Sequence, residues 1–224
     1  MQSVRRTGAG RRRKPREGGL DTRESVLLAA RSVFSRRGFE GTSTREVAEV
    51  AGVNNAMIYY HFKDKVALYR AVLARSFDEF DRIWENPIFS SRSSCRTKIQ
   101  TYIEKFIEFQ HENEELRRIM SMEFACCSDS YKWLADNYFV HSYDKLARVL
   151  KDGMRTGELR KVDPSLAIPS LVGMIIHSFI MRPMAERITG KKLNLEVKRF
   201  GRFVAEMFFS GLGEKSLLRK GGGE

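Results

Sequence analysis

The segment 43–61 constrains the fold more than any other part of the chain, because it holds two helix signals separated by a glycine turn. Ser43 lies three residues before Glu46, which is the spacing of a capping box. In such a box the serine hydroxyl accepts from the backbone amide of the glutamate, whose side chain reaches back. Gly52 ends this first helix at a turn that favours positive φ. A second helix, over about residues 55–60, is too short to form without tertiary support. The segment predicts a helix-turn-helix packed against neighbouring helices.

Helical patterns continue through the rest of the chain. Asp21 and Glu24 have the same capping-box spacing, and Gly38 is a stop signal for that helix. Asp64 is a candidate cap for a long helix that reaches Trp84. Alternating apolar and polar runs, which are typical of strands, are almost absent, so we expect an all-α fold. Further helices are expected over about residues 99–107, 116–127, 131–155, 163–185 and 195–212.

The charge of the chain favours a polyanion as partner. Lys and Arg number 40 against 28 Asp and Glu, a formal net charge of +12, and this balance is typical of nucleic-acid-binding proteins. The first sixteen residues hold seven basic side chains and no acidic one. We therefore expect residues 1–19 to form a disordered basic arm. A solvated tail without a function, or an expression tag, is the alternative interpretation.

The helix-turn-helix pattern supplies the groups that a DNA-binding motif needs. In such a motif the first helix crosses the phosphate backbone, and side chains near the start of the second helix meet base edges in the major groove. Thr44 and Arg45 lie at a helix N-terminus, where backbone amides and the helix dipole favour phosphate. Asn54, Asn55 and Ala56 open the second helix. Asn can pair with adenine there, and Ala can contact a thymine methyl group.

Four further side chains are candidates for contacts with phosphate: Tyr59, Tyr60, Lys63 and Lys65. Their hydroxyl and ammonium groups are suited to the phosphate oxygens that fix the position of a protein on DNA. Tyr59 could instead be a packing residue of the small helical core, which is also the simpler interpretation of Phe62.

Residues 42–65 have a distinctive order. They include Thr42, Ser43, Thr44, Arg45, Glu46, Val47 and Ala48, then Ala51, Gly52 and Val53, then Ile58, Tyr59, Tyr60, His61, Phe62, Lys63, Asp64 and Lys65. Over about residues 21–72 the chain closely resembles the DNA-binding domain of the tetracycline-repressor (TetR) family. The resemblance implies a DNA-binding domain over residues 20–66 and an effector-binding and dimerisation domain over residues 67–213. Residues 214–224, which are rich in glycine, would form a flexible tail.

The start of the second helix departs from the family pattern. The family commonly has a Ser-Lys-Gly/Ala-Thr type of sequence there, whereas this chain has Asn54, Asn55, Ala56 and Met57. Asn55 in place of Lys removes one expected phosphate contact, and Met57 replaces a small polar side chain. We expect the same docking on DNA but a different operator sequence.

The resemblance also indicates partners. It implies that two copies pair through the helices at about residues 163–185 and 195–212, and that the dimer binds a pseudo-palindromic double-stranded DNA operator as a repressor. The family's effector cavity lies among the middle helices of the second domain. Phe106, Met120, Phe124 and His177 are therefore candidate contacts of a small, largely apolar effector. Each of them could instead be a core residue, since aromatic residues and Met at helical spacing are commonly buried.

Other functional classes find little support in the sequence. It has no paired-carboxylate motif, glycine-rich phosphate loop, nucleophile motif or metal-ligand spacing, so we expect no enzyme, no cofactor and no metal site. A constitutive architectural DNA-binding protein without an effector is the alternative function.

The cysteines and the apolar segments bear on the location of the protein. The odd number of cysteines and the lack of a signal-peptide pattern lead us to expect a cytoplasmic protein. We expect Cys126 and Cys127 to be buried thiols, with redox sensing as an open alternative. The longest apolar stretch, residues 166–181, has polar interruptions and is shorter than the roughly 20 residues of a membrane span. We expect a buried helix there and no membrane partner.

Overall fold

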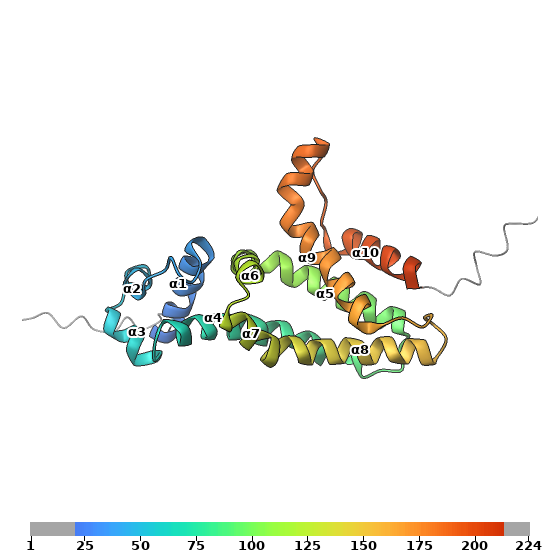
Figure 1. Cartoon of the computed structure of the whole chain (residues 1–224), viewed down its shortest axis with the longest axis horizontal. Helices are drawn as coiled ribbons and strands as arrows, with labels where there is room; N and C mark the ends of the chain where they lie inside the picture. The colour runs from blue at the N-terminus through green and yellow to red at the C-terminus, as the bar shows by residue number, and fades with distance from the viewer. Residues whose placement is uncertain (1–20, 213–224) are drawn as a thin grey trace, which may run out of the picture.

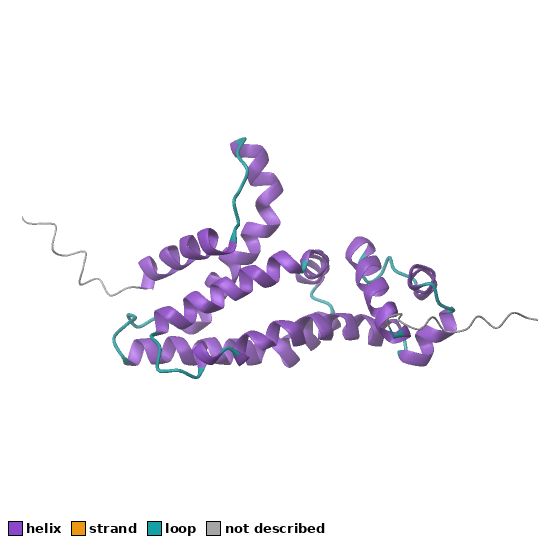
Figure 2. Cartoon of the chain, turned by 180° about the vertical axis from the view of Figure 1, so that it is seen from behind, coloured by secondary structure: helices purple, strands orange, loops and turns teal. Residues whose placement is uncertain are grey.

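The computed structural model describes residues 21–212, and every regular element among them is a helix (Figure 2). The predicted all-α fold is confirmed. The predicted basic arm, residues 1–19, and the predicted tail, residues 214–224, lie outside the described residues. The main helices are α1 (Thr22–Arg37), α2 (Thr44–Ala51), α3 (Asn55–His61), α4 (Lys65–Asp81), α5 (Cys95–Glu112), α6 (Glu114–Cys126), α7 (Asp129–Leu134), α8 (Val140–Arg155), α9 (Pro164–Thr189) and α10 (Val197–Leu212). Short 3₁₀ helices follow α4 at η1 (Arg82–Glu85) and η2 (Pro87–Phe89).

The predicted start and end of α2 are confirmed. Ser43 Oγ accepts a hydrogen bond from the amide of Glu46 at 3.2 Å, and Gly52 ends the helix with a φ of 67°, in the region that favours glycine. The second half of the predicted capping box was wrong, because the Glu46 carboxylate forms an ion pair with Arg37 of α1 at 2.9 Å. This pair ties α2 to α1.

The capping box predicted for α1 does not form. Asp21 precedes the helix, but within the described residues its side chain makes no capping hydrogen bond. The Glu24 carboxylate pairs with Arg75 of α4 instead, so a partner from another helix replaces the local one. The cap predicted for α4 is confirmed, since Asp64 Oδ1 accepts from the amide of Ala67 at 2.8 Å.

The helices α1, α2 and α3 form a small domain at one end of the molecule, and α4 leads from it into the larger body (Figure 1). The short helix α3 is held there by Ile58, whose side chain is fully buried. The core of this domain is made by Val26, Ala30, Phe34, Val47, Ile58 and Leu68. Burial of these side chains supplies the tertiary support that α3 lacks by itself.

The larger body is centred on α5. Both α8 and α10 pack against α5, while α9 packs against α8 and α5. Aromatic side chains join α4 to α5, with the ring centroid of Phe80 5.1 Å from that of Phe106 and 4.8 Å from that of Phe109. The helix predicted over residues 131–155 is divided into α7 and α8 by a π-helical turn, η3 (Ala135–Phe139).

The helix α9 differs most from the prediction. It has 26 residues and continues beyond the expected end near residue 185, and its C-terminal part projects from the body (Figure 1). By length and composition it could span a membrane, with a mean hydropathy of 1.6 over an 18-residue window of which 28% is buried. The helix is longer than the apolar stretch of residues 166–181, and the expectation of a buried helix was wrong for the single chain. The helix continues past its polar interruptions, and much of its apolar surface has no cover within the described chain.

The three cysteines are free thiols. Cys95 is buried, but Cys126 and Cys127 are exposed, so the expectation of buried thiols at this pair was wrong. The reason is their position at the C-terminal end of α6, where Cys127 has a φ of 48° and turns the chain towards α7.

Candidate nucleic-acid interface and ligand cavity

The start of α3 carries three of the predicted DNA contacts. Asn54 and Ala56 are exposed, and Asn55 is half-buried. Asn54 also caps the helix, because its Oδ1 accepts from the amide of Ala56 at 2.9 Å. The Asn54 oxygen is thus engaged by the helix, and Asn55 Oδ1 is buried without a hydrogen-bond partner among the described residues. In this conformation neither side chain presents its amide oxygen to a base edge.

The hydroxyl groups of Thr44 and Tyr59 join α2 to α3 at the surface. Thr44 Oγ1 lies 3.2 Å from Tyr59 Oη, and 52% of Tyr59 is exposed, so Tyr59 is not a packing residue of the core. Tyr60, Arg45 and Lys63 are exposed on the same domain. The two hydroxyls lie beside the N-terminus of α2, where backbone amides and the helix dipole attract phosphate.

Lys65 is engaged inside the protein. Its Nζ donates to the carbonyl oxygens of Phe39 at 2.9 Å and Thr42 at 3.2 Å, and it lies 4.2 Å from the centroid of the Phe39 ring. The ammonium group thereby fixes the loop between α1 and α2 to the start of α4. This differs from the predicted phosphate contact, because a Lys ammonium has only three donors and two are used here.

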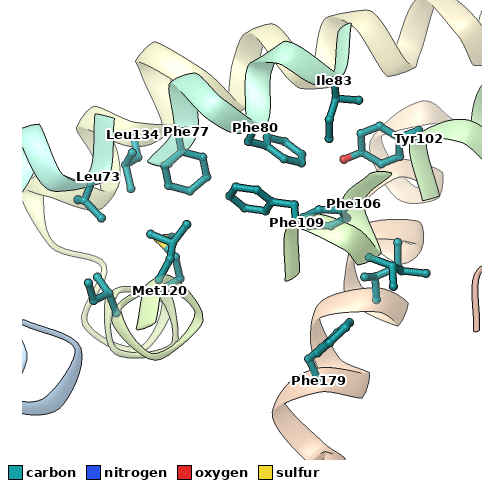
Figure 3. Close-up of a cluster of buried hydrophobic side chains, with 14 of the residues drawn as sticks. Leu73, Phe77, Phe80, Ile83, Tyr102, Phe106, Phe109, Met120, Leu134 and Phe179 are labelled. Atoms are coloured by element: carbon teal, nitrogen blue, oxygen red, sulfur yellow. The ribbon is translucent and has the colours of Figure 1, made fainter. Parts of the chain in front are cut away.

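A cavity of about 340 Å³ lies between α4, α5, α6, α8 and α9. Its walls are mainly apolar and rich in aromatic rings, and Figure 3 shows five of the lining side chains, Phe77, Phe80, Phe106, Phe109 and Met120. This volume falls at the lower end of the range of about 300–1,000 Å³ that is common for small-molecule sites. The larger domain therefore has room for a small, largely apolar ligand.

The predicted effector contacts fall in two places. Phe106, Met120 and Phe124 line the cavity. His177 lies instead in a surface groove between α9 and α10, beside Met174. His177 and the cavity are on different sides of α9 because the residues of that helix that line the cavity, among them Ile176 and Ile180, are on another face.

The cavity also contains polar groups that the sequence pattern did not reveal. Gln110 and Arg117 line it, and within the described residues Gln110 Oε1 and Arg117 Nη1 are buried without a hydrogen-bond partner. Burial lowers the pKa of Arg117. Gln110 lies near the end of α5 and Arg117 near the start of α6, so no spacing within a single helix could have predicted that they face the same cavity.

Residues 26–72 match the sequence pattern of the family described as bacterial regulatory proteins, tetR family. Residues 26–72 form a DNA-binding domain of the TetR family. The matched segment holds α2 and α3 with the exposed side chains described above. This domain, together with the similarity to known transcriptional regulators, makes the chain a DNA-binding transcriptional regulator and not an enzyme.

TetR-family relatives extend the similarity into the second domain. RutR from Escherichia coli K12 is 28% identical over 177 residues, which are 78% of this chain and 82% of RutR. FasR, a transcriptional activator from Mycolicibacterium smegmatis, is 31% identical over 127 residues, which are 54% of this chain and 55% of FasR. BepR, a repressor from Brucella suis, is 38% identical over 64 residues, which are 29% of this chain and 31% of BepR.

Solved structures share the fold. FadR from Bacillus subtilis, crystallised with stearoyl-CoA, matches with a TM-score of 0.70 at 20% identity, over 84% of this chain and 98% of FadR. HlyIIR, a hemolysin II regulator, matches with a TM-score of 0.65 at 24% identity, over 87% of this chain and 98% of HlyIIR. At these identities the likeness concerns the fold alone.

The helix α6 lies between the cavity and the DNA-binding domain. Met120 and Phe124 of α6 line the cavity, and α6 also packs against α1. The buried Glu123 carboxylate accepts a hydrogen bond from Tyr69 Oη of α4 at 2.6 Å and another from Ser128 Oγ. Burial, together with this carboxylate, raises the pKa of Tyr69. A ligand that moves α6 would therefore act on both α1 and α4.

Proposed function

We propose that this chain is a homodimeric repressor in the cytoplasm that leaves a pseudo-palindromic operator when a small, largely apolar effector binds the cavity. The observation that carries the proposal is the position of α6, which lines the cavity and also packs against α1 of the DNA-binding domain. An effector that binds better to one arrangement of α6 shifts the population towards that arrangement. The dimer leaves the DNA when that arrangement puts its two copies of α3 at a spacing that does not match the operator.

The DNA-facing part of the proposal rests on α2 and α3. Thr44, Arg45 and the hydroxyl of Tyr59 would hold phosphates, while Asn55 and Ala56 would meet base edges. In a dimer, two copies of α3 would enter successive major grooves about 34–36 Å apart. This arrangement explains why the operator should be a pseudo-palindrome.

The proposed dimer would form through the exposed apolar face of α9 and α10. Leu166, Met184, Phe203 and Met207 are between 54% and 70% exposed in the single chain. Exposed apolar side chains in such number indicate a protein interface, and a two-fold dimer buries the same face on both copies. His177 lies in the groove between these helices and would be an interface residue.

The effector-responsive function is preferred to an architectural DNA-binding protein because the second domain contains a cavity. An architectural protein would depend mainly on phosphate contacts, including those of the basic residues 5–16. The FadR structure that shares this fold holds stearoyl-CoA, which supports a ligand with a large apolar part.

One experiment separates the two functions. Genomic fragments that bind the purified chain are selected, and the affinity for one of them is measured for the full chain and for a chain without its first sixteen residues. A repressor keeps its preference for the fragment over random DNA after truncation and binds both more weakly. Loss of all binding on truncation would instead favour the architectural function.

A further inference from the structure

Two polar atoms in the otherwise apolar cavity have no partner among the described residues. They are Arg117 Nη1 and Gln110 Oε1, and Gln110 is only 6% exposed. Buried polar groups in proteins are nearly always hydrogen-bonded, so each exception calls for an explanation. Arg117 as a whole is only partly buried, but its Nη1 is out of reach of water, and a donor of a charged group without an acceptor is more unfavourable still.

The acidic side chains near Arg117 are engaged elsewhere. Glu114, which acts on Arg117 electrostatically, pairs with Arg118 at 2.7 Å. Arg182, a second cation near Arg117, keeps its own partner, Glu186, at 3.0 Å. No carboxylate of the described chain forms an ion pair with Arg117. Since a guanidinium stays charged at all ordinary pH values, Arg117 brings to the cavity a positive charge that has no ion-pair partner within the described chain.

The polar neighbours of Arg117 are already satisfied. Asn113 Oδ1 accepts from Arg31 at 2.9 Å, and its amide nitrogen donates to the carbonyl of Phe109 at 3.0 Å. Ser121 Oγ donates to the backbone carbonyl of Arg117 at 2.8 Å. These groups hold the corner between α5 and α6 in place, and they leave Arg117 and Gln110 available to a ligand.

An aromatic wall supports the guanidinium from α9. Its central carbon lies 5.1 Å from the ring centroid of Phe179, which stands on the α9 side of the aromatic cluster (Figure 3). A cation held over a ring face in this way keeps its N–H donors at the edge, free to bind an acceptor. Phe179 is not among the residues that line the cavity; the lining itself is mainly aromatic and aliphatic carbon.

We propose that the cavity binds an amphipathic monocarboxylate, with its carboxylate on Arg117 and Gln110 and its apolar body among the aromatic side chains. The inference rests on the proposed function, because it names the ligand class of the same cavity. The carboxylate accepts from the guanidinium, which suits paired N–H donors. The Gln110 amide can turn to donate to it as well. A single cation matches a single negative charge, and the small volume favours a compact headgroup.

The test compares two probes with the same apolar chain, decanoate and decanol, by isothermal titration calorimetry of the full chain. Arg117→Met removes the charge while keeping an apolar side chain of similar length, and Arg118→Met is the matched control on the exposed side of α6. We expect Arg117→Met to weaken decanoate binding by about tenfold or more, as for the loss of a charged hydrogen bond. Decanol binding should change by less than about threefold, and Arg118→Met should leave both affinities unchanged.

The comparison of the two probes on the unaltered chain needs no variant, so it carries the test even where Arg117→Met unfolds. Decanoate binding at least as tightly as decanol supports the proposal, because the acid must first lose the hydration of its charge. Binding of decanol alone, or equal loss of both probes in Arg117→Met, overturns it. DNA binding by the same samples is measured separately. Intact operator binding without decanoate binding would reject this inference and leave the DNA-binding function standing.

Discussion

Tyr69 in α4 donates a 2.6 Å hydrogen bond to the carboxylate of Glu123 in α6, and both side chains are buried. The bond joins the helix that leaves the DNA-binding domain to a helix that lines the cavity. No local pattern predicts it, because the two residues are 54 positions apart in the chain.

Tyr69→Phe should therefore affect both stability and regulation. Removing the hydroxyl leaves the buried Glu123 with one donor fewer, so we expect the free energy of unfolding in urea to fall by about 1–3 kcal/mol. The matched control is Tyr138→Phe, since Tyr138 Oη donates at 2.8 Å to Asp78 in an exposed pair. Equal losses in the two variants would show that the buried bond has no special role.

Lys65 and Lys63 should respond differently to replacement. Lys65→Met removes the ammonium that binds the carbonyls of Phe39 and Thr42, and we expect a loss of about 1–3 kcal/mol in unfolding free energy. Lys63→Ala should leave stability unchanged, because its side chain is exposed, and should lower the slope of log affinity against log salt by about one. Unfolding in urea and DNA binding at several salt concentrations measure both effects. A stable Lys65→Met protein with a reduced salt slope would restore the phosphate role for Lys65.

The two asparagines at the start of α3 should also separate. Asn54→Ala removes the cap on the amide of Ala56, and a lost N-cap typically lowers stability by about 0.5–2 kcal/mol. Asn55→Ala should leave stability nearly unchanged and relax the preference at one base position by roughly 1–3 kcal/mol. Affinities for a set of operators with single base changes provide the measurement. Uniform weakening on all of them by Asn55→Ala would argue against base recognition by that residue.

An acidic substitution on the apolar face of α10 should prevent dimerisation. Phe203 is 57% exposed in the single chain, and Phe203→Asp would place a charge within the proposed interface. Light scattering should then report the mass of one chain, 25.8 kDa, in place of twice that mass. Val140→Asp is the control, because Val140 is similarly exposed, at 54%, on α8. If both variants still form dimers, the dimer interface does not include Phe203 of α10.

The thiols should differ in reactivity. Cys126 and Cys127 are exposed and should react quickly with a disulfide reagent at neutral pH, whereas Cys95 is buried and should react only on unfolding.

Burial raises the pKa of Cys95 from its ordinary value of 9.0 to about 11. The folded chain therefore holds the thiol proton more tightly than the unfolded chain does. The stabilising effect of the protonated, buried thiol is fully present below pH 9 and is lost as the pH rises towards 11. Replacing Cys95 by Ala should remove that part of the alkaline loss, as followed by unfolding at several pH values.

Sequence patterns predicted features whose cause is local. Ser43, Gly52 and Asp64 were assigned correctly because caps and turns depend on residues within a few positions. The side chain of Glu24 was misassigned because its partner comes from another helix. The bonds of Lys65 to the loop between α1 and α2 form only in the folded chain and could not be predicted, while its phosphate contact stays a prediction.

The candidate site shows the same division. Phe106, Met120 and Phe124 could be placed in the cavity from helical spacing and family resemblance. Gln110 and Arg117 could not, since a polar residue on an amphipathic helix is more often solvated than directed into a cavity. The sequence also could not reveal that His177 lies on a different face of α9 from the cavity, because that depends on how α9 packs against α5 and α8.

A footprint of the purified chain on a genomic fragment that it selects tests the central claim most directly. The account predicts a protected pseudo-palindrome whose half-sites are centred about 34–36 Å apart or at a multiple of one helical turn. Asn55→Ala should keep the protected region in place and tolerate a change at one position in each half-site. Even protection along the fragment, with no preferred sequence and no two-fold symmetry, would contradict it.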